Sequence, residues 1–446
     1  MRSPSFLSLL GPLLAKEWRE LLAARSYWLL LLAIGPLIGN DFINAVNLYA
    51  EASGIGGGTA ALSEGLTPLD GLLVPTWGAY DLAVTLLLPF VAIRLLAAEK
   101  ESGALKLALQ FPASRALQMA AKVLALLGGW AVAWLAGCIA LLLWRWYGGH
   151  VYWPEALNLL LGHWLRMLLG AGVALAAAAL AESAASAAIV TLSFTLGTWA
   201  LDFIATARGG WLAEIAVYTP TSALRFFEQG LLRLSTALAL LVLAAAGCAL
   251  AGLWLHTGRS LRARLLGSCA VLAAAVLLLF AAARTRASWD MSENRRNSFA
   301  RADELALRQI NAPIRITINL AAEDPRLMDY ERGVLHKLQR VLPQVETVYA
   351  ARSRTGLFEG AAENYGEIWY ELEGRKVMNR STTVPIVLEQ LYQLAQRTPP
   401  VAPAAGADEP VFPGYPLAVR PRWANWIFYG LWPSAVLLLW WLTRRN

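Results

Sequence analysis

Long apolar runs alternate with short polar connections along most of the chain, and this pattern predicts membrane-spanning helices. Each run has about 20 residues, the length of α-helix that crosses the hydrocarbon core of a bilayer. The runs predict spans at residues 27–48, 78–97, 121–143, 159–181, 185–204, 234–256, 264–283 and 424–442. We therefore expect a polytopic α-helical membrane protein, with a six-span core at 27–256 and two further spans.

The segment before the first span, residues 1–26, is charged but has an apolar side. At helical spacing, one side collects the residues Leu13, Leu14, Trp18, Leu21 and Leu22. Such a stripe is typical of a helix that lies on a membrane surface. We expect an amphipathic connecting helix here.

Residues 284–398 have a different pattern, in which short alternating segments predict strands. The predicted elements are a helix capped by Ser298 and ending near Ile310, a strand at 313–320, a helix at 324–342, a strand at 345–350, a hairpin of 367–372 and 375–379, and a helix at 383–397. This order predicts a small α/β domain. A basic loop and the seventh span, residues 257–283, precede it, and a Pro-rich, extended tether at 399–422 leads to the eighth span and tail at 423–446.

Two of the predicted spans carry polar stripes at helical spacing. The fifth span has Thr191, Thr195, Thr198 and Asp202, and the first span has Asn40, Asp41, Asn44 and Asn47. Such side chains face lipid only at a high free-energy cost, so each stripe points at protein or water. Two interpretations stay open: hydrogen bonds between helices of the bundle, or a path between two protomers.

The distribution of basic residues orients the predicted spans. Of 446 residues, 57% are hydrophobic, and the net charge is +7. Fourteen Lys and Arg residues flank the spans on the side of the termini, whereas the short loops of the other side hold four. By the positive-inside rule both termini are cytoplasmic and residues 284–422 are extracytoplasmic, in a multi-pass protein of the cell inner (cytoplasmic) membrane. The positive charge needs no nucleic acid to explain it.

The sequence contains no recognisable catalytic constellation. No phosphate-binding Gly-x-x-x-x-Gly-Lys-Ser/Thr stretch occurs, and no nucleophile elbow occurs at 284–422. The four histidines have no metal-ligand spacing and are expected at surfaces or interfaces, and the three cysteines lie in apolar runs as small hydrophobic residues. We expect no enzyme activity, bound cofactor or metal in this chain.

The connection between the second and third spans, residues 97–122, has a composition of its own. Glu99 and Glu101 precede a break at Gly103, a short amphipathic helix is predicted from Ala104 to Gln110, and Phe111-Pro112-Ala113-Ser114-Arg115 ends that helix. A short charged helix between two spans can serve as an attachment point for another protein, and we call residues 99–115 the handle.

This connection resembles the corresponding loop of the type-2 ABC transporter permease family. The match consists of Glu99, Glu101, Gly103, Leu105, Pro112, Ser114, Arg115 and Lys122, and Ala104 departs from the usual Thr or Ser. The resemblance implies a coupling helix at 99–115 that docks on a separate ATPase through Glu99, Glu101, Gly103, Leu105, Leu109, Phe111, Pro112 and Arg115. It also implies a second permease protomer, two ATPase copies that bind ATP and Mg, and polar stripes near the dimer interface.

The opening of the predicted α/β domain resembles the gliding-motility auxiliary family. The resemblance rests on residues 288–299 and on Ala312-Pro313-Ile314-Arg315-Ile316, with Met291-Ser292 and Ser298-Phe299-Ala300 in place of the commoner residues. Together the two resemblances imply the membrane subunit of an ABC-type exporter fused to an auxiliary domain that handles substrate or a partner. The alternative is a mechanical scaffold that does not transport, in which the outer domain only binds a partner protein.

Overall fold

We describe the protein from a computed structural model. The residues it describes are 6–54, 66–108, 110, 113–208, 211–216, 218–255, 258–310, 312–321, 324–342, 344–350, 364–400, 412 and 414–445.

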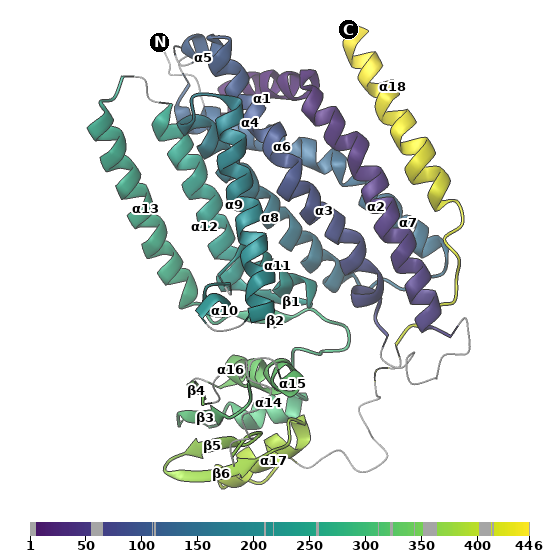
Figure 1. Cartoon of the computed structure of the whole chain (residues 1–446), viewed down its shortest axis with the longest axis vertical. Helices are drawn as coiled ribbons and strands as arrows, with labels where there is room; N and C mark the ends of the chain where they lie inside the picture. The colour runs from purple at the N-terminus through teal and green to yellow at the C-terminus, as the bar shows by residue number, and fades with distance from the viewer. Residues whose placement is uncertain are drawn as a thin grey trace.

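Among the described residues, eight helices are long and apolar enough to cross a membrane. They are Arg25–Ala52, Leu69–Glu101, Arg115–Trp146, Trp153–Leu180, Ala184–Ala205, Leu234–Trp254, Leu261–Ala283 and Trp426–Arg445. Each contains or largely overlaps one predicted span, so the prediction of eight spans is confirmed at the level of helix length and composition. The architecture is compatible with a polytopic helical membrane protein, in which both termini lie at one end of the bundle (Figure 1).

Several of these helices are interrupted, and the structure divides them into shorter elements. The elements are α2 (Arg25–Ala52), the π-helical turn η2 (Leu69–Leu73), α3 (Val74–Leu86), α4 (Leu88–Glu101), α6 (Arg115–Ala133), α7 (Leu135–Trp146), α8 (Trp153–Leu180), α9 (Ala184–Arg208), α12 (Leu234–Trp254), α13 (Leu261–Ala283), η4 (Trp426–Leu431) and α18 (Trp432–Arg445). The second span breaks at Leu87, two residues before Pro89, which cannot donate a helical hydrogen bond.

Helix α8 is the centre of the bundle, because it packs against α12, α4, α9 and α3. Its contact with α12 is backbone to backbone. A Cβ atom on Gly172 would lie 2.6 Å from the carbonyl oxygen of Ala244, and one on Gly247 would lie equally close to the carbonyl of Gly172. Small residues thus permit the closest helix pair of the bundle, as is common in membranes.

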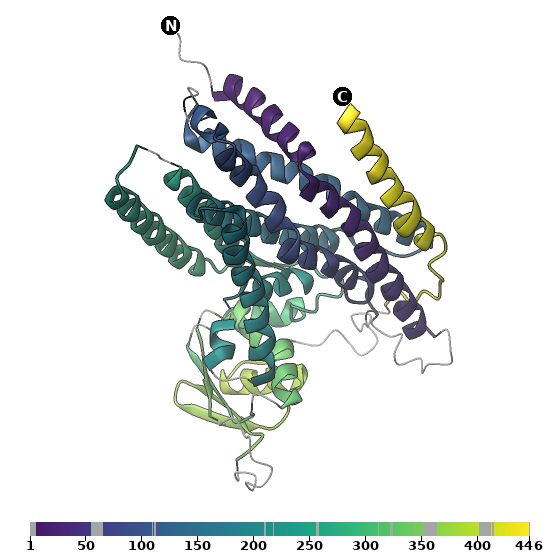
Figure 2. The same ribbon diagram turned by 45° about the horizontal axis from the view of Figure 1, so that its top comes forward.

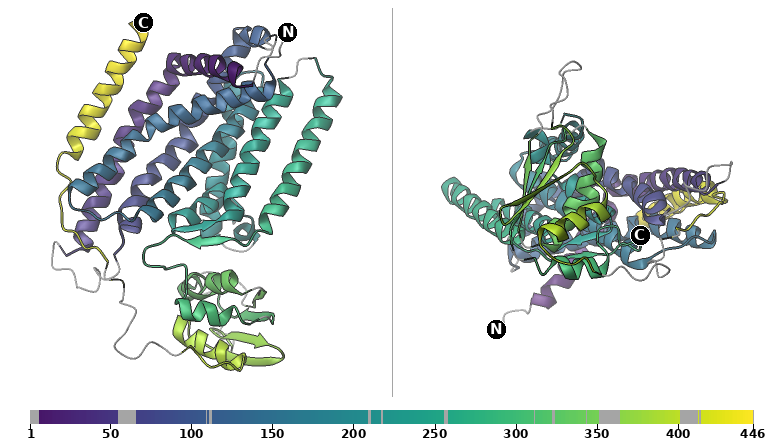
Figure 3. Two further views of the ribbon diagram at one scale, coloured as in Figure 1. Left: turned by 180° about the vertical axis from the view of Figure 1, so that it is seen from behind. Right: turned by 90° about the horizontal axis from the view of Figure 1, so that it is seen from below.

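The last two spans flank the core at opposite edges, α13 beside α12 and α18 beside α2 (Figures 1 and 3). Helix α18 and the turn η4 use a glycine groove on α2. Cβ atoms on Gly35 and Gly39 would lie 2.1 and 2.3 Å from the side chains of Trp432 and Phe428. The indole of Trp432 also donates to the carbonyl of Leu31 at 2.7 Å.

The amphipathic helix α1 (Phe6–Ala23) crosses the end of the bundle where both termini lie, and the short helix α5 (Ala104–Ala108) lies at the same end (Figures 1 and 2). Helix α1 packs mainly on α6. We call this the α5 end. The opposite end, which we call the sheet end, carries the short helices α10 (Trp211–Ala216) and α11 (Pro220–Glu228), which follow α9 in the chain.

Among the described residues, strands appear only at and beyond the sheet end (Figure 1). Strand β1 (Leu231–Arg233) pairs with β2 (Ser288–Asp290), which the sequence did not predict. Four further strands form a sheet in the order β4 (Val345–Tyr349), β3 (Ile314–Ile318), β5 (Ile368–Leu372), β6 (Arg375–Asn379), with β3 and β4 parallel. The hairpin turn at Glu373-Gly374 has positive φ at both residues, 52° and 80°, as the predicted two-residue turn requires.

Helices α14 (Arg301–Leu307), α15 (Pro325–Tyr330), η3 (Glu331–Leu335), α16 (His336–Val341) and α17 (Val384–Leu394) share one hydrophobic cluster with this sheet. Every second residue of β3 and β5 is buried in it. One expectation is wrong: Ser298 does not cap a helix. Helix α14 begins at Arg301, and the Ser298 hydroxyl instead donates to Asp290 at 2.7 Å.

Candidate functional site

The predicted handle is a short helix that projects from the α5 end. Helix α4 ends at Glu101, and Gly103 turns the chain with φ +76°, a conformation that favours glycine. Ser114 then caps α6 by accepting from the Leu117 amide at 3.2 Å. Leu109, Phe111 and Pro112 lie outside the described residues.

Glu99 belongs to a buried group of charges that we call the basal charge cluster. Its members are Lys16, Glu17 and Glu20 on α1, Glu99 on α4 and Lys122 on α6. The Lys122 ammonium lies 2.8 Å from Glu17, 2.9 Å from Glu99 and 2.8 Å from the carbonyl oxygen of Leu95. All three of its hydrogens therefore have an acceptor. The cluster joins the base of the handle to two other helices.

Exposure differs across the basal charge cluster. The side chains of Glu17, Glu99 and Lys122 are only 3–4% exposed, whereas that of Lys16 is 40% exposed while it pairs with both Glu20 and Glu99. Burial raises the pKa of Glu17, and the nearby Lys122 ammonium opposes that shift. The positive charge of Lys122 thus offsets the free-energy cost of burying the Glu17 and Glu99 carboxylates.

Lys100 ties the handle to a fourth helix. Its ammonium donates to the carbonyl oxygens of Ala178, Ala179 and Ala181 at 3.0, 3.1 and 2.6 Å, at the end of α8. The last carbonyls of a helix lack intrahelical partners and carry a partial negative charge, so a lysine there is stabilising. Helix α5 therefore projects from a base held by α1, α6 and α8.

The remaining handle residues divide into buried and exposed groups. Glu101 and Gly103 are exposed, Arg115 is half-buried, and Leu105 packs against the chain's own core cluster. Leu107, which the sequence analysis did not single out, is 70% exposed. The large apolar side chain that α5 presents is therefore Leu107 rather than Leu105.

Three carboxylates of the basal charge cluster lie close enough to share a metal ion. Glu17, Glu20 and Glu99 have ligand oxygens within 4.8 Å of one another. The Lys16 and Lys122 ammonium groups already pair with these oxygens. The three carboxylates therefore form an ion-pair cluster with these two lysines.

The polar stripe of α9 is bonded within the chain. Thr191 and Thr198 donate to carbonyls of their own helix, whereas the Thr195 hydroxyl donates across to the carbonyl oxygen of Thr85 at 3.1 Å. That carbonyl is the one left without a helical donor by Pro89, four residues later. Thr195 thus satisfies a backbone group that the break in the second span leaves free.

Arg166 on α8 is a buried charge that the sequence analysis did not single out. It is fully buried, with Nε 3.1 Å from Asp81 and Nη2 3.4 Å from the Thr85 hydroxyl. Together with Thr195 these residues form a chain of polar contacts across α3, α8 and α9, which we call the interhelical polar chain. A charge within a helix of membrane-spanning composition is costly unless paired, and such residues commonly mark functional positions. The signal was present in the sequence, because Arg166 is the single charged residue in the run 159–181.

The histidine prediction is wrong for His163, which lies one turn before Arg166. Its side chain is 1% exposed, and neither ring nitrogen has a hydrogen-bond partner among the described residues. His150 is one-third exposed and lies 3.1 Å from both carboxylate oxygens of Glu293. His336 is exposed, and His256 lies outside the described residues.

The polar stripe of α2 faces away from the rest of the chain. Asn40, Asn44 and Asn47 are exposed, and Asn40 donates to the half-buried Asp41 at 3.0 Å. Helix α2 packs mainly on α3, while α9 packs mainly on α8, α10 and α4. The structure therefore does not bring the two stripes together within one protomer.

At the sheet end, Asp202 of the α9 stripe pairs with Arg225 on α11. Burial, followed by the nearby Asp81 carboxylate, raises the pKa of the neighbouring Glu228 to about 7. Arg225 and Glu228 line a cavity of about 520 Å³ whose other wall includes Asp329 and Arg332. This cavity lies between the bundle and the sheet-bearing part of the chain.

Residues 288–298 anchor the sheet-bearing part to the bundle. Arg296 pairs with Asp70, and the Glu293 amide donates to Glu155 at 2.5 Å. The Tyr415 hydroxyl also donates to Glu293, at 2.6 Å. These contacts join the segment that follows β2 to the starts of η2 and α8.

Compared with known proteins, the chain matches no family model, no curated protein and no solved structure. The family resemblances therefore rest on the residues quoted above, and the geometry of the handle carries the functional argument.

Proposed function

We propose that the chain is the membrane subunit of an ABC-type exporter, driven by a separate ATPase that docks on α5. The observation that carries this proposal is the handle: a short helix that projects from the bundle while its base is fixed to α1, α6 and α8. A partner that pushes α5 would move these helices together, because buried ion pairs resist separation. ATP and Mg would be bound by the partner.

The proposal includes an orientation and an outer domain. Both termini lie at the α5 end, and the sheet lies at the other (Figure 1). With the positive-inside bias, this supports an inner (cytoplasmic) membrane protein with α5 in the cytoplasm and residues 284–422 as a small extracytoplasmic α/β domain with its tether. Cysteines introduced at Ser102 and Asn364 should be labelled from opposite faces; labelling from one face contradicts this orientation.

The proposal also includes a second protomer. Asn40, Asn44 and Asn47 are exposed on a helix of membrane-spanning composition, and such side chains are costly against lipid. A second copy of the permease that covers this face would supply polar partners or enclose water. In that dimer the α2 stripe would line a path between protomers.

The docking test compares two exposed apolar residues at opposite ends of the bundle. Leu107 is 70% exposed on α5, and Tyr218, at the sheet end, is 87% exposed. The full chain is purified from native membranes, and the amount of co-purifying P-loop ATPase per permease is measured by mass spectrometry. Leu107→Ser should reduce ATPase retention severalfold, since removal of an apolar anchor at an interface can cost ~2 kcal/mol, whereas Tyr218→Ser should not. Full retention in Leu107→Ser, or no ATPase with the wild type, overturns the proposal.

A second candidate function is a mechanical scaffold that does not transport, and one observation favours it. Thr191 and Thr195 are fully buried and bonded within the chain, so they line no path in one protomer. The two functions differ in the effect of Asp202→Ala on a complex that still assembles. An exporter should lose substrate-stimulated ATP hydrolysis, whereas a scaffold should keep its basal hydrolysis unchanged.

A further inference from the structure

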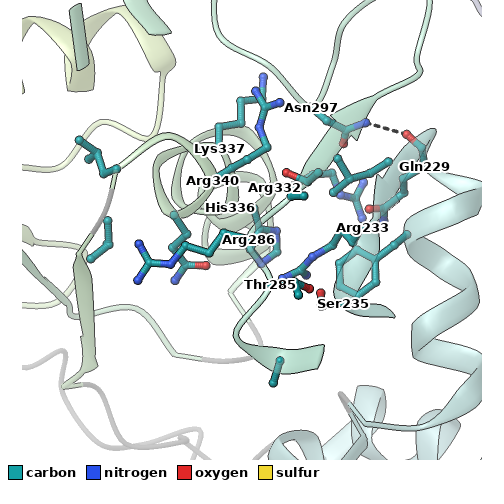
Figure 4. Close-up of a pocket in the computed structure, with 18 residues that line it drawn as sticks. Gln229, Arg233, Ser235, Thr285, Arg286, Asn297, Arg332, His336, Lys337 and Arg340 are labelled. Carbon is teal, nitrogen blue, oxygen red and sulfur yellow. Dashed lines mark hydrogen bonds between the residues drawn. The ribbon is translucent and has the colours of Figure 1, made fainter. Parts of the chain in front are cut away.

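A second cavity, of about 290 Å³, lies beside the sheet end and is strongly basic. It is enclosed by the β1–β2 pair, the end of α13, and the η3–α16 helix (Figure 4). Among its described lining residues there is no carboxylate. The basic ones are Arg233, Arg286, Arg332, His336, Lys337 and Arg340.

The fold brings these residues together from two distant parts of the chain. In β1, Leu231 and Arg233 alternate with Leu232 and both line the cavity. Arg332, His336 and Arg340 are spaced four residues apart, so they lie on one face of η3–α16. The close-up shows the Arg233, Arg332 and His336 side chains gathered between strand and helix (Figure 4).

Three carboxylates beside the cavity already have partners. Glu304 pairs with Arg340, and Glu331 accepts from the Tyr349 hydroxyl at 2.6 Å. Asp290 accepts from the Ser298 hydroxyl at 2.7 Å and from the Asn297 amide. Arg340 is therefore compensated by Glu304, and Arg332 also lines the neighbouring cavity with Glu228 and Asp329. The wall of the basic cavity still carries more positive than negative charge, because its described lining has no carboxylate of its own.

This excess, together with the packing of the surrounding chain, makes the charged forms of Lys337 and His336 costly. Burial lowers the pKa of Lys337, and Arg340 lowers it further, while Asp290 and Glu304 oppose the shift. Burial lowers the pKa of His336 too, with additional contributions from Arg233 and Arg332 against the opposing Glu331. A bound anion would offset both effects.

We propose that this cavity binds the phosphate group of an anionic ligand. Guanidinium groups suit phosphate because they offer paired N–H donors, and Thr285 and Ser235 add hydroxyls to the wall. Ala283 and Ser235, at the ends of α13 and α12, also line the cavity, so it lies at the depth of lipid headgroups if these helices span. The phosphate can belong to a phospholipid of that leaflet or to a soluble phosphorylated compound. This inference does not depend on an ATPase partner.

The test removes two charges from the cavity without breaking a described ion pair. The variant Arg332→Gln, Lys337→Gln is compared with Arg315→Gln, Lys376→Gln, which removes the same charge from exposed positions on β3 and β6. In the lipid arm, native mass spectrometry counts phosphatidylglycerol retained by the full chain, with phosphatidylcholine as the reference. In the soluble arm, inorganic pyrophosphate is titrated at constant ionic strength against the melting temperature in a neutral detergent.

Wild type and control should bind at least one of these probes, and the cavity variant should bind it about tenfold more weakly or worse, since it loses hydrogen bonds from two charged donors to the phosphate. Loss in the lipid arm identifies a phospholipid; loss in the soluble arm alone identifies a soluble phosphorylated ligand. Equal binding by the cavity variant and the control in both arms overturns the proposal, as does the absence of probe binding by the wild type. If the double variant aggregates, the single Arg332→Gln change, at an exposed helix position, gives the same comparison.

Discussion

Replacement of Lys122 by methionine should destabilise the protein far more than replacement of Lys16. Lys122→Met leaves Glu17 and Glu99 buried, 3% and 4% exposed, without the ammonium that lies between them. Breaking a buried ion pair by removing one partner costs about 3–5 kcal/mol. Lys16 is 40% exposed, so the loss of its pairs should cost only ~0.2–1 kcal/mol.

The measurement is the melting temperature of the full chain in detergent, followed by tryptophan fluorescence. With roughly 2 °C per kcal/mol for a large domain, Lys122→Met should lower the melting temperature by about 6–10 °C and Lys16→Met by at most about 2 °C. The double variant Lys122→Met, Glu99→Gln should melt higher than Lys122→Met alone, because one stranded carboxylate has been neutralised.

Equal melting temperatures for Lys122→Met and Lys16→Met would refute the reasoning, since both lysines would then be screened by solvent. A double variant that melts no higher than Lys122→Met would also refute it, because the destabilisation would then come from packing rather than from the buried carboxylates.

Three further outcomes are expected. Gly39→Leu should lower the melting temperature by several degrees because its side chain would occupy the space of Phe428, whereas Gly78→Leu, which meets open space, should not. Thr195→Val should cost about 1–2 kcal/mol in a denaturant melt, since it leaves the carbonyl freed by the proline unbonded. Burial raises the pKa of Glu228 in the folded protein from 4.5 to about 7. The folded state therefore has its full stability below about pH 4.5 and loses part of it as the pH rises through 7, where the buried carboxyl must ionise. Glu228→Gln should therefore raise the melting temperature at pH 8 and leave it unchanged at pH 4; the same shift at both pH values contradicts the assignment.

The sequence predicted the spans well because the length of an apolar run is a direct physical signal. A run of about 20 apolar residues has few alternatives to a membrane-spanning helix. The strands β3 and β5 were predicted because their buried residues alternate. The pair β1–β2 was missed, since each strand has three residues and their pairing joins segments more than fifty residues apart.

The candidate site could be predicted only where its signal is local. The break at Gly103 and the short helix after it follow from neighbouring residues. The burial of Glu99 does not, because its partners Lys16 and Lys122 come from other helices. For the same reason the sequence could place Thr195 on a stripe but could not show that the stripe is bonded to Thr85.

The base of the handle and the interhelical polar chain share the helix Leu69–Glu101, and this connects the two parts of the candidate site. Helix α4 carries Glu99 and Lys100 at one end and begins at Leu88, beside the break before Pro89. The carbonyl bound by Thr195 and the hydroxyl bound by Arg166 both belong to Thr85, on the other side of that break. A force on α5 therefore acts first along α4, and the break is where the span can bend without losing an intrahelical hydrogen bond. We expect the contacts of Thr85 to be the first in the bundle to change when the handle moves.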